Sequence, residues 1–246
     1  MQDKYVGDFG DFVKYGLLRH LSEGKQLGVA WYLHPNEEGP DGRKLGYLKK
    51  PDIWKPLDRD LFNGLNTIVQ SESRSVAALE SSSLLNGAKF TNERLETDLL
   101  PSQWRQRRKW RADWFNDVVT KLQGCKIIFT DPDNGLCLDK RYRPSRAKYW
   151  KRLPLAEALN LSTGRTAVLY HHNTRRPGGH RKEIRYWMKK LPHCVGAFYC
   201  NTDGFRTFFV ISDDDVIKRR LDEFAKKWAR VGELIPPGGV RNDQGC

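Results

Sequence analysis

The chain has 246 residues, enough for an α/β domain to fold without a metal or disulfide staple. Apolar residues make up 39% of it, and the mean hydropathy is −0.69, yet its 8 Trp, 9 Tyr and 11 Phe are too many for a disordered chain. The longest apolar runs are too short for a membrane span, and no apolar signal core is visible near the N-terminus. The five cysteines lack a CxxC pair, which favours reduced thiols in the cytoplasm. We therefore exclude membrane, secreted and collagenous classes.

The apolar pattern predicts alternating helices and strands. Asp8 is placed to cap a first helix whose apolar stripe consists of Phe12, Val13, Gly16, Leu17 and Leu21. The elements expected next are a strand over 29–33, a helix over 57–69, strands over 75–79 and 88–91, a helix over 102–121 and a strand over 126–130.

The second half continues the alternation. A basic loop precedes a short helix near 155–159, a strand over 166–171, a helix over 180–190, and strands over 195–200 and 205–211. The last two strands flank a hairpin turn over 201–204, and Ser212 is placed to cap a final helix. We predict an α/β, Rossmann-like fold with a mainly parallel seven-stranded sheet, helices on both faces and a C-terminal antiparallel hairpin. Residues 1–234 form a single domain, and 235–246 form a loose tail.

The positive charge is concentrated in one part of the sequence. Lys and Arg outnumber Asp and Glu by 43 to 30 overall, and residues 139–190 contain fifteen basic and three acidic residues. Basic side chains displace counterions from phosphates and aromatic rings stack on bases, so we expect a nucleic-acid partner, RNA or DNA. The expected contacts are Arg105, Arg108, Arg143, Arg175, Arg176, Arg181 and Lys182. The alternative is a solvated basic face with its aromatic residues turned to the core.

Polar residues follow several predicted strands, where ligands bind in open α/β sheets. They are the segment 34–42, Glu80, the Asp-Pro-Asp-Asn-Gly run over 131–135, and the His-His-Asn run over 171–173. Glu80 could instead cap the next turn, and 131–135 could be an ordinary turn. His171 and His172 point to opposite faces of a strand, so at most one of them faces the site. The sequence contains no zinc-type spacing, Walker A motif or GxGxxG motif.

Three segments resemble the large-subunit ribosomal RNA adenine methyltransferases. KYVGDFGDFVKYGLLRHL is similar to their G-N-x-x-D-V-x-K-H segment, with Gly7, Asp8, Asp11 and Lys14 at the matching positions. WYLHPNEEGPDGRKLGYL resembles their cofactor loop, Y-L-D-T-H-x-G-x-G-x-Y-x-L. IIFTDPDNGL stands where they have the catalytic L-I-D-P-P-Y-E motif. The pattern of elements is also that of the S-adenosylmethionine-dependent methyltransferase fold.

The resemblance implies methylation of an amino group on a nucleic-acid base, with S-adenosylmethionine as cofactor. Asp131 would hold the acceptor amine, and Lys14 would lie at the floor of the site. The catalytic candidates are Asp131, Asp133, Asn134 and Lys14. The cofactor-binding candidates are His34, Asn36, Gly39, Gly42, Glu80, which would bind the ribose, and Asp11.

The sequence departs from that family at two places. Asn134 stands where the family has a base-stacking Tyr, and HPNEEGP carries two carboxylates where the family loop is rich in glycine. One alternative is therefore a metal-dependent nuclease, with Mg²⁺ held by Asp131 and Asp133 together with Asp8 or Asp11. Another is a catalytically inactive methyltransferase scaffold that binds nucleic acid.

Overall fold

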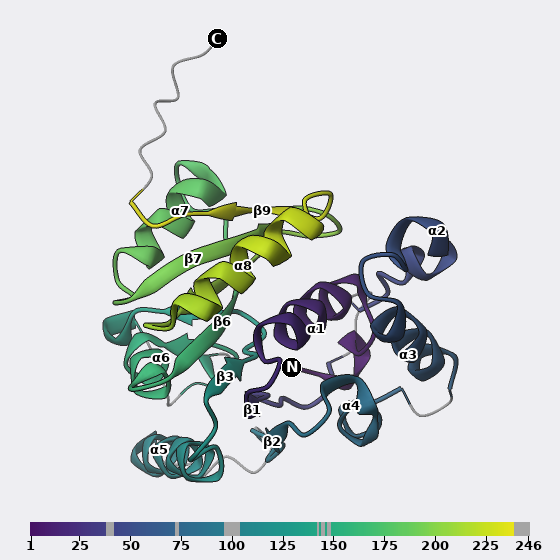
Figure 1. Cartoon of the computed structure of the whole chain (residues 1–246). Coiled ribbons are helices and arrows are strands. Elements are labelled where there is room, and N and C mark those ends of the chain that lie inside the picture. The colour runs from purple at the N-terminus through teal and green to yellow at the C-terminus, as the bar shows by residue number, and fades with distance from the viewer. Residues whose placement is uncertain are drawn as a thin grey trace.

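The computed structural model describes residues 1–37, 42–71, 74–95, 104–141, 143, 146 and 149–238. A seven-stranded sheet forms its centre, in the order β2-β1-β3-β6-β8-β7-β9 (Figure 1). The strands are β1 (Leu27–Ala30), β2 (Lys89–Thr91), β3 (Ile127–Thr130), β6 (Thr166–His172), β7 (Cys194–Cys200), β8 (Arg206–Ile211) and β9 (Gly232–Ile235). A small second sheet pairs β4 (Leu136–Cys137) with β5 (Leu153–Pro154).

Most strands of the main sheet run in one direction. β1 pairs in parallel with β2 and with β3, and β3 pairs in parallel with β6. β8 is antiparallel to both β6 and β7, so β7 runs in the same direction as β6. β9 is antiparallel to β7. The predicted Rossmann-like α/β fold, with a mainly parallel sheet and a C-terminal hairpin, is confirmed.

The α-helices are α1 (Phe9–Leu21), α2 (Pro51–Trp54), α3 (Arg59–Gln70), α4 (Val76–Ser81), α5 (Trp104–Lys121), α6 (Leu155–Ser162), α7 (Gly179–Met188) and α8 (Asp215–Lys227). The described residues also form short 3₁₀ helices: η1 (Asp3–Tyr5), η2 (Gly46–Lys49), η3 (Ser83–Leu85) and η4 (Asp139–Arg141). Within the described ranges, none of the helices has both the length and the apolar character needed to cross a membrane.

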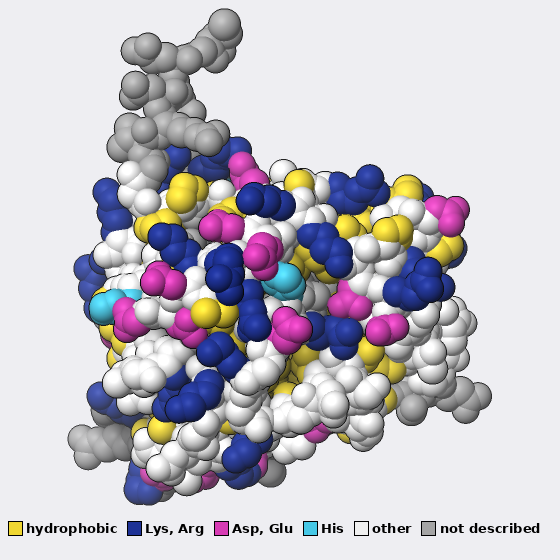
Figure 2. Space-filling model, viewed as in Figure 1, with side chains coloured by type: hydrophobic (Ala, Val, Ile, Leu, Met, Phe, Trp, Pro, Cys, Tyr) yellow, Lys and Arg dark blue, Asp and Glu magenta, His cyan; other side chains and the backbone are white. Residues whose placement is uncertain are grey.

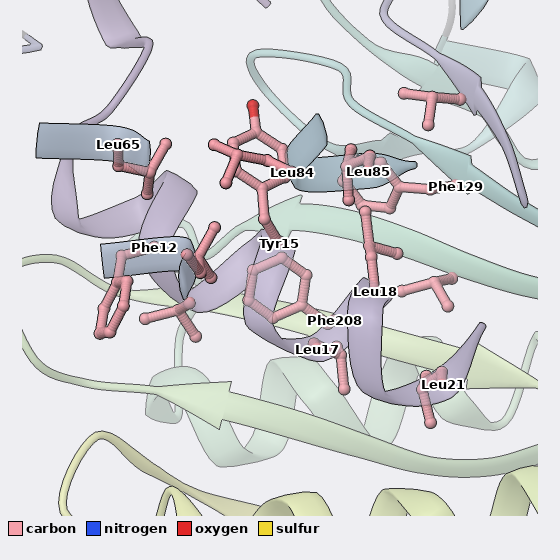
Figure 3. Close-up of a cluster of buried hydrophobic side chains, with 14 of the residues drawn as sticks. Phe12, Tyr15, Leu17, Leu18, Leu21, Leu65, Leu84, Leu85, Phe129 and Phe208 are labelled. Carbon is pink, nitrogen blue, oxygen red and sulfur yellow. The ribbon is translucent and has the colours of Figure 1, made fainter. Parts of the chain in front are cut away.

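Each face of the sheet carries its own apolar core. Because side chains alternate along a strand, Ile127 and Phe129 of β3 enter the core that contains α1, α3 and α8, whereas Ile128 enters the core with α5, α6 and α7. Figure 3 shows part of the first core, where Phe12 and Leu18 of α1 lie among the buried side chains. The expected covering of both faces is therefore present.

Asp8 caps α1 as predicted, because its Oδ1 accepts a hydrogen bond from the main-chain nitrogen of Asp11 at 3.0 Å. The cap predicted for the last helix was wrong. Asp214 caps α8 by accepting from the nitrogen of Val216 at 2.8 Å, while Ser212 accepts from the nitrogen of Asp214.

The predicted strand over 75–79 was also wrong, because this segment begins helix α4. Its buried residues, Val76 and Leu79, are three positions apart, which places them on one side of a helix. Ser75 caps the helix by accepting from the nitrogen of Ala78 at 3.1 Å.

The seventh strand of the sheet is β9 instead, so Ile235 belongs to a strand and not to the predicted tail. Residues 239–246 of that tail lie outside the described residues.

Candidate functional site

A cavity of about 370 Å³ opens at the carboxyl edge of the sheet, beside the N-terminal end of α1. Asp11 and Lys14 come from α1, and Asp131, Asp133 and Asn134 follow the end of β3. The structure thus brings together the four predicted catalytic residues and one predicted cofactor-binding residue. Gly42, another predicted cofactor-binding residue, also lines the cavity.

Lys14 connects α1 to the segment after β3. Its Nζ lies 2.6 Å from Asp11 Oδ1 and 2.7 Å from Asp131 Oδ2, and all three side chains are buried. Burial alone would lower the pKa of Lys14, but Asp11 and Asp131 outweigh it and raise that pKa. The lysine is therefore a fixed cation that holds Asp131 in position.

Asp11 is fixed by several donors. Its second oxygen accepts hydrogen bonds from the nitrogen of Gly7 at 3.0 Å and from the hydroxyl of Tyr15 at 3.1 Å. Burial raises the pKa of Asp11 to about 6, although Lys14 opposes the shift. The carboxyl group of Asp11 can therefore change its protonation state in weakly acidic solution.

Asp131 keeps one oxygen available to a ligand. Lys14 binds Oδ2, whereas Oδ1 accepts no hydrogen bond from the residues that the structure describes. Asp131 lines the cavity, so this oxygen can accept a hydrogen bond from a group bound there.

Both oxygens of Asp133 are already paired. The amino group of Met1 lies 2.7 Å from Oδ1, and Gln2 Nε2 donates to Oδ2 at 2.7 Å. Burial alone would raise the pKa of Asp133, but the Met1 amino group and Gln2 lower it. Asn134 is positioned by its main chain, whose nitrogen donates to the carbonyl of Lys151 at 2.8 Å.

Three predicted cofactor-binding residues lie outside the lining of this cavity. His34 is buried with its Nδ1 3.3 Å from the carbonyl of Pro35, and Asn36 accepts a hydrogen bond from the nitrogen of Asp3. Glu80 belongs to α4 and not to a strand end, and it accepts from Trp31 Nε1 at 2.7 Å and Asn92 Nδ2 at 3.0 Å. Gly39 lies outside the described residues.

The two adjacent histidines of β6 face opposite sides, as expected. His172 lines the cavity, whereas His171 is buried on the other face of the sheet. His171 Nδ1 accepts from the nitrogen of Leu136 at 3.0 Å, so the proton is on Nε2, which lies 3.2 Å from Glu183 Oε1. His171 therefore connects β6 to α7 and does not contact the cavity.

The predicted basic contacts are dispersed. Arg175 and Lys182 are exposed near the start of α7, Arg176 lies 3.7 Å from the centre of the Tyr186 ring, and Arg181 pairs with Glu233 at 2.7 Å. Arg108 and Arg143 are exposed elsewhere, and the side chain of Arg105 is outside the described part. On the face over α1 and α8, Lys and Arg are interspersed with Asp and Glu (Figure 2). The net positive charge therefore does not form a single patch on that face.

The cavity is also lined by Arg206, Lys44 and Tyr170, which were not predicted from the sequence. Arg206 is the first residue of β8 and lies opposite His172 of β6. An arginine within a predicted strand that is otherwise mainly apolar was a possible signal in the sequence, but the direction of its side chain depends on the pairing of β8 with β6.

No family model matches the chain, and a search of curated proteins finds no match. The fold and the site define a class: a Rossmann-like α/β protein with a charged cavity at the carboxyl edge of its sheet. In the ranges that the structure covers, no three His, Cys, Asp or Glu residues are grouped as ligands of a metal ion.

Proposed function

We propose that the protein is an S-adenosylmethionine-dependent methyltransferase that modifies an amino group of a nucleic-acid base. The observation that carries this proposal is Asp131, which lines the cavity and has one oxygen bound by Lys14, while its other oxygen accepts no hydrogen bond from the described residues. A fixed carboxylate can accept a hydrogen bond from an acceptor amine and so direct its nitrogen lone pair. The sequence resemblance assigns the same role to Asp131.

The cavity is compatible with the cofactor. Its volume of about 370 Å³ lies within the range of small-molecule sites. Asp8 and Glu37 line it, and their carboxylates suit the sulfonium and ammonium groups of S-adenosylmethionine. The cofactor supplies a methyl group bonded to a positively charged sulfur. Asp131 would hold the acceptor amine during the transfer, and Lys14 would hold that carboxylate in position.

An exposed aromatic ring near this edge supports a nucleic-acid substrate. Phe205 is 49% exposed in the turn between β7 and β8, and its ring centre lies 4.5 Å from that of His180 in α7. Its neighbour Arg206 lines the cavity. Aromatic rings beside basic groups stack on unpaired bases, and Phe205 could replace the aromatic residue that is missing at Asn134.

The nuclease alternative has weaker support. A shared Mg²⁺ would need the carboxylates of both Asp131 and Asp133. Each of them is already paired with an ammonium group, Asp131 with Lys14 and Asp133 with the amino group of Met1. A metal ion would have to displace these cations. If the protein binds nucleic acid but transfers no methyl group, the alternative of a catalytically inactive scaffold is correct.

The test replaces Asp131 by Asn or Ala and measures methyl transfer from labelled S-adenosylmethionine to RNA and DNA. We expect activity to fall by about 100-fold or more, because the acceptor amine loses its positioning carboxylate. Cofactor affinity should change little, since Asp131 contacts the acceptor. Asp133→Asn is the matched control from the same cavity, and it should retain most of the activity, with or without Mg²⁺.

A different pattern would contradict the proposal. If the wild-type protein binds no S-adenosylmethionine by calorimetry, the methyltransferase assignment fails. If it cleaves nucleic acid, and if EDTA and both substitutions abolish cleavage, the nuclease is correct.

A further inference from the structure

Arg206 is a buried cation that forms no ion pair with any residue that the structure describes. Only 6% of its surface is exposed, and Nη2 donates to the main-chain carbonyl of Asp203 at 3.0 Å. Nη1 is buried and has no hydrogen-bond partner among the described residues. Leaving a charged donor unpaired is unfavourable, so a polar partner supplied from outside the chain would stabilise this arrangement.

Lys44 adds a second positive charge at the same place. Its Nζ donates to the carbonyl of Asp203, the acceptor that Arg206 also uses. Neither cation forms an ion pair with a carboxylate in the described ranges of the chain. Two cations thus converge on one neutral oxygen, and both line the cavity.

The nearby carboxylates have other partners. Asp8 uses Oδ1 to cap α1, and Asp11 and Asp131 share the ammonium group of Lys14. The charge of Arg206 is therefore only partly balanced by its surroundings. The N-terminal end of α1 lies beside Arg206, with Gly10 in its first turn, but the nitrogens of Phe9 and Asp11 already donate to the Lys44 carbonyl and to Asp8 Oδ1.

Two glycines make room for these cations. A Cβ on Gly10 would lie 2.5 Å from Arg206 Nη1, although the helical backbone at Gly10 would accept any side chain. A Cβ on Gly204 would lie 2.8 Å from both Arg206 Nη2 and Lys44 Nζ. The packing around the guanidinium thus depends on the absence of side chains from two separate elements.

We propose that Arg206 and Lys44, beside the first turn of α1, form an oxyanion subsite of the cavity, and that this subsite binds a phosphate group. Arginine presents paired donors that suit phosphate oxygens, and lysine adds a point charge. Tyr170 and His172 form the adjoining wall. Phosphate binding does not require methyl transfer; only the assignment of this phosphate to the nucleic-acid substrate rests on the proposed function.

The first experiment titrates the full chain with inorganic phosphate by calorimetry, at constant ionic strength and with chloride as the reference anion. The wild-type protein should bind phosphate, and Arg206→Gln should weaken binding by about tenfold or more. Lys44→Ala should weaken it by about threefold to tenfold, because its charge is nearer to solvent. Lys50→Ala, an exposed lysine away from the cavity, is the matched control and should bind as the wild type does.

Lys44→Ala and one further variant, Gly10→Ala, keep the proposal testable if Arg206→Gln does not fold. Gly10→Ala keeps every charge but displaces the guanidinium, so it should weaken phosphate binding while the protein retains its circular dichroism spectrum. If Arg206→Gln does not fold, Lys44→Ala and Gly10→Ala decide the question. Unchanged phosphate affinity in these two variants, or no phosphate binding by the wild type, would overturn the proposal.

A second comparison identifies the source of the oxyanion. If the subsite binds a nucleic-acid phosphate, Lys44→Ala should weaken binding of a short single-stranded oligonucleotide and leave S-adenosylhomocysteine binding unchanged. If it binds the carboxylate of the cofactor instead, the same substitution should weaken S-adenosylhomocysteine binding and leave methylthioadenosine, which lacks that carboxylate, unaffected. The second result would retain the oxyanion subsite and reject the phosphate assignment. If the wild-type protein binds phosphate but shows no methyl transfer, only the proposed function is contradicted.

Discussion

Among the single residues of the cavity, the charged side chains are held in position by ion pairs with groups of opposite charge. Lys14 binds two carboxylates, yet each has a distinct environment: Asp11 also accepts from Gly7 and Tyr15, while Asp131 has a second oxygen that accepts no hydrogen bond from the described residues. Removing a buried charge from such a group leaves its partner uncompensated. The same lysine therefore contributes both to the fold and to the proposed chemistry.

The raised pKa of Asp11 predicts a specific pH dependence of stability. Its pKa moves from 3.8 to about 6 on folding, so the folded state binds a proton more tightly than the unfolded state does. As the pH rises through this window, the wild type loses relative stability, by up to about 3 kcal/mol. Asp11→Asn cannot titrate, so its stability relative to the wild type should increase by a similar amount between about pH 4 and pH 7.

Urea unfolding across this pH range measures the difference. Asp52→Asn, at an exposed position, is the control, and its curve should stay parallel to that of the wild type. A parallel curve for Asp11→Asn as well would show that Asp11 does not titrate in this window.

Among the secondary-structure elements, helix α1 contributes side chains both to the core and to the cavity. Phe12 packs into the core with α8, where its ring centre lies 5.0 Å from that of Trp228, whereas Lys14 reaches the cavity. Gly16 allows α8 to approach closely, because a Cβ there would lie 2.4 Å from Trp228 Cζ2. The close packing of these helices fixes the position of the first turn of α1 beside the sheet.

Helix α7 is attached to the sheet by Glu183, which predicts a second effect on stability. The Glu183 carboxylate accepts from the nitrogen of Thr174 at 2.8 Å and from its hydroxyl at 2.6 Å, and it lies beside His171. Although burial alone would raise the pKa of Glu183, these donors lower it to about 2. Glu183→Gln should lower the free energy of unfolding by about 1.5–3 kcal/mol near pH 7.

The stabilisation from Glu183 is fully present above the unfolded pKa of 4.5 and is lost as the pH falls toward about 2. Urea unfolding at pH 7 and at acidic pH should therefore show the difference between variant and wild type shrinking in acid. Glu223→Gln, at an exposed position on α8, is the control. A pH-independent difference would mean that Glu183 acts through packing and not through its charge.

At the scale of the whole molecule, the net charge of +13 predicts salt-sensitive binding of nucleic acid. Arg175 and Lys182 are exposed near the carboxyl edge that contains the cavity. Replacing both by Ala should weaken binding, and should flatten the slope of log K against log salt by about 0.7 for each lost phosphate contact on single strands.

Fluorescence anisotropy with a labelled single-stranded oligonucleotide measures this slope. The double substitution Lys49→Ala and Lys50→Ala removes the same charge from a distant exposed segment and should alter the slope less. Equal slopes for the wild type and the Arg175 and Lys182 variant would exclude this edge as the binding surface.

Features that depend on neighbouring residues could be predicted from the sequence alone. Asp8 and the apolar spacing that follows it predicted α1 with its cap, because capping and helical periodicity are local. The buried strand that ends before Asp131 was predicted for the same reason, and it placed that carboxylate at the edge of the sheet. The resemblance of the segment around Lys14 to a family motif predicted that both residues belong to one site, and the structure brings them within 2.7 Å of each other.

Features that depend on contacts between distant segments could not be predicted from the sequence and became visible in the tertiary structure. Ile235 is in a strand because β9 pairs with β7 and forms an edge of the sheet. Glu80 accepts a hydrogen bond from Trp31 because α4 packs beside that residue. Arg206 enters the cavity because β8 lies between β6 and β7, and the sequence did not specify this order of strands. Local preference sets where helices and strands form, but pairing and packing between remote segments decide which side chains meet.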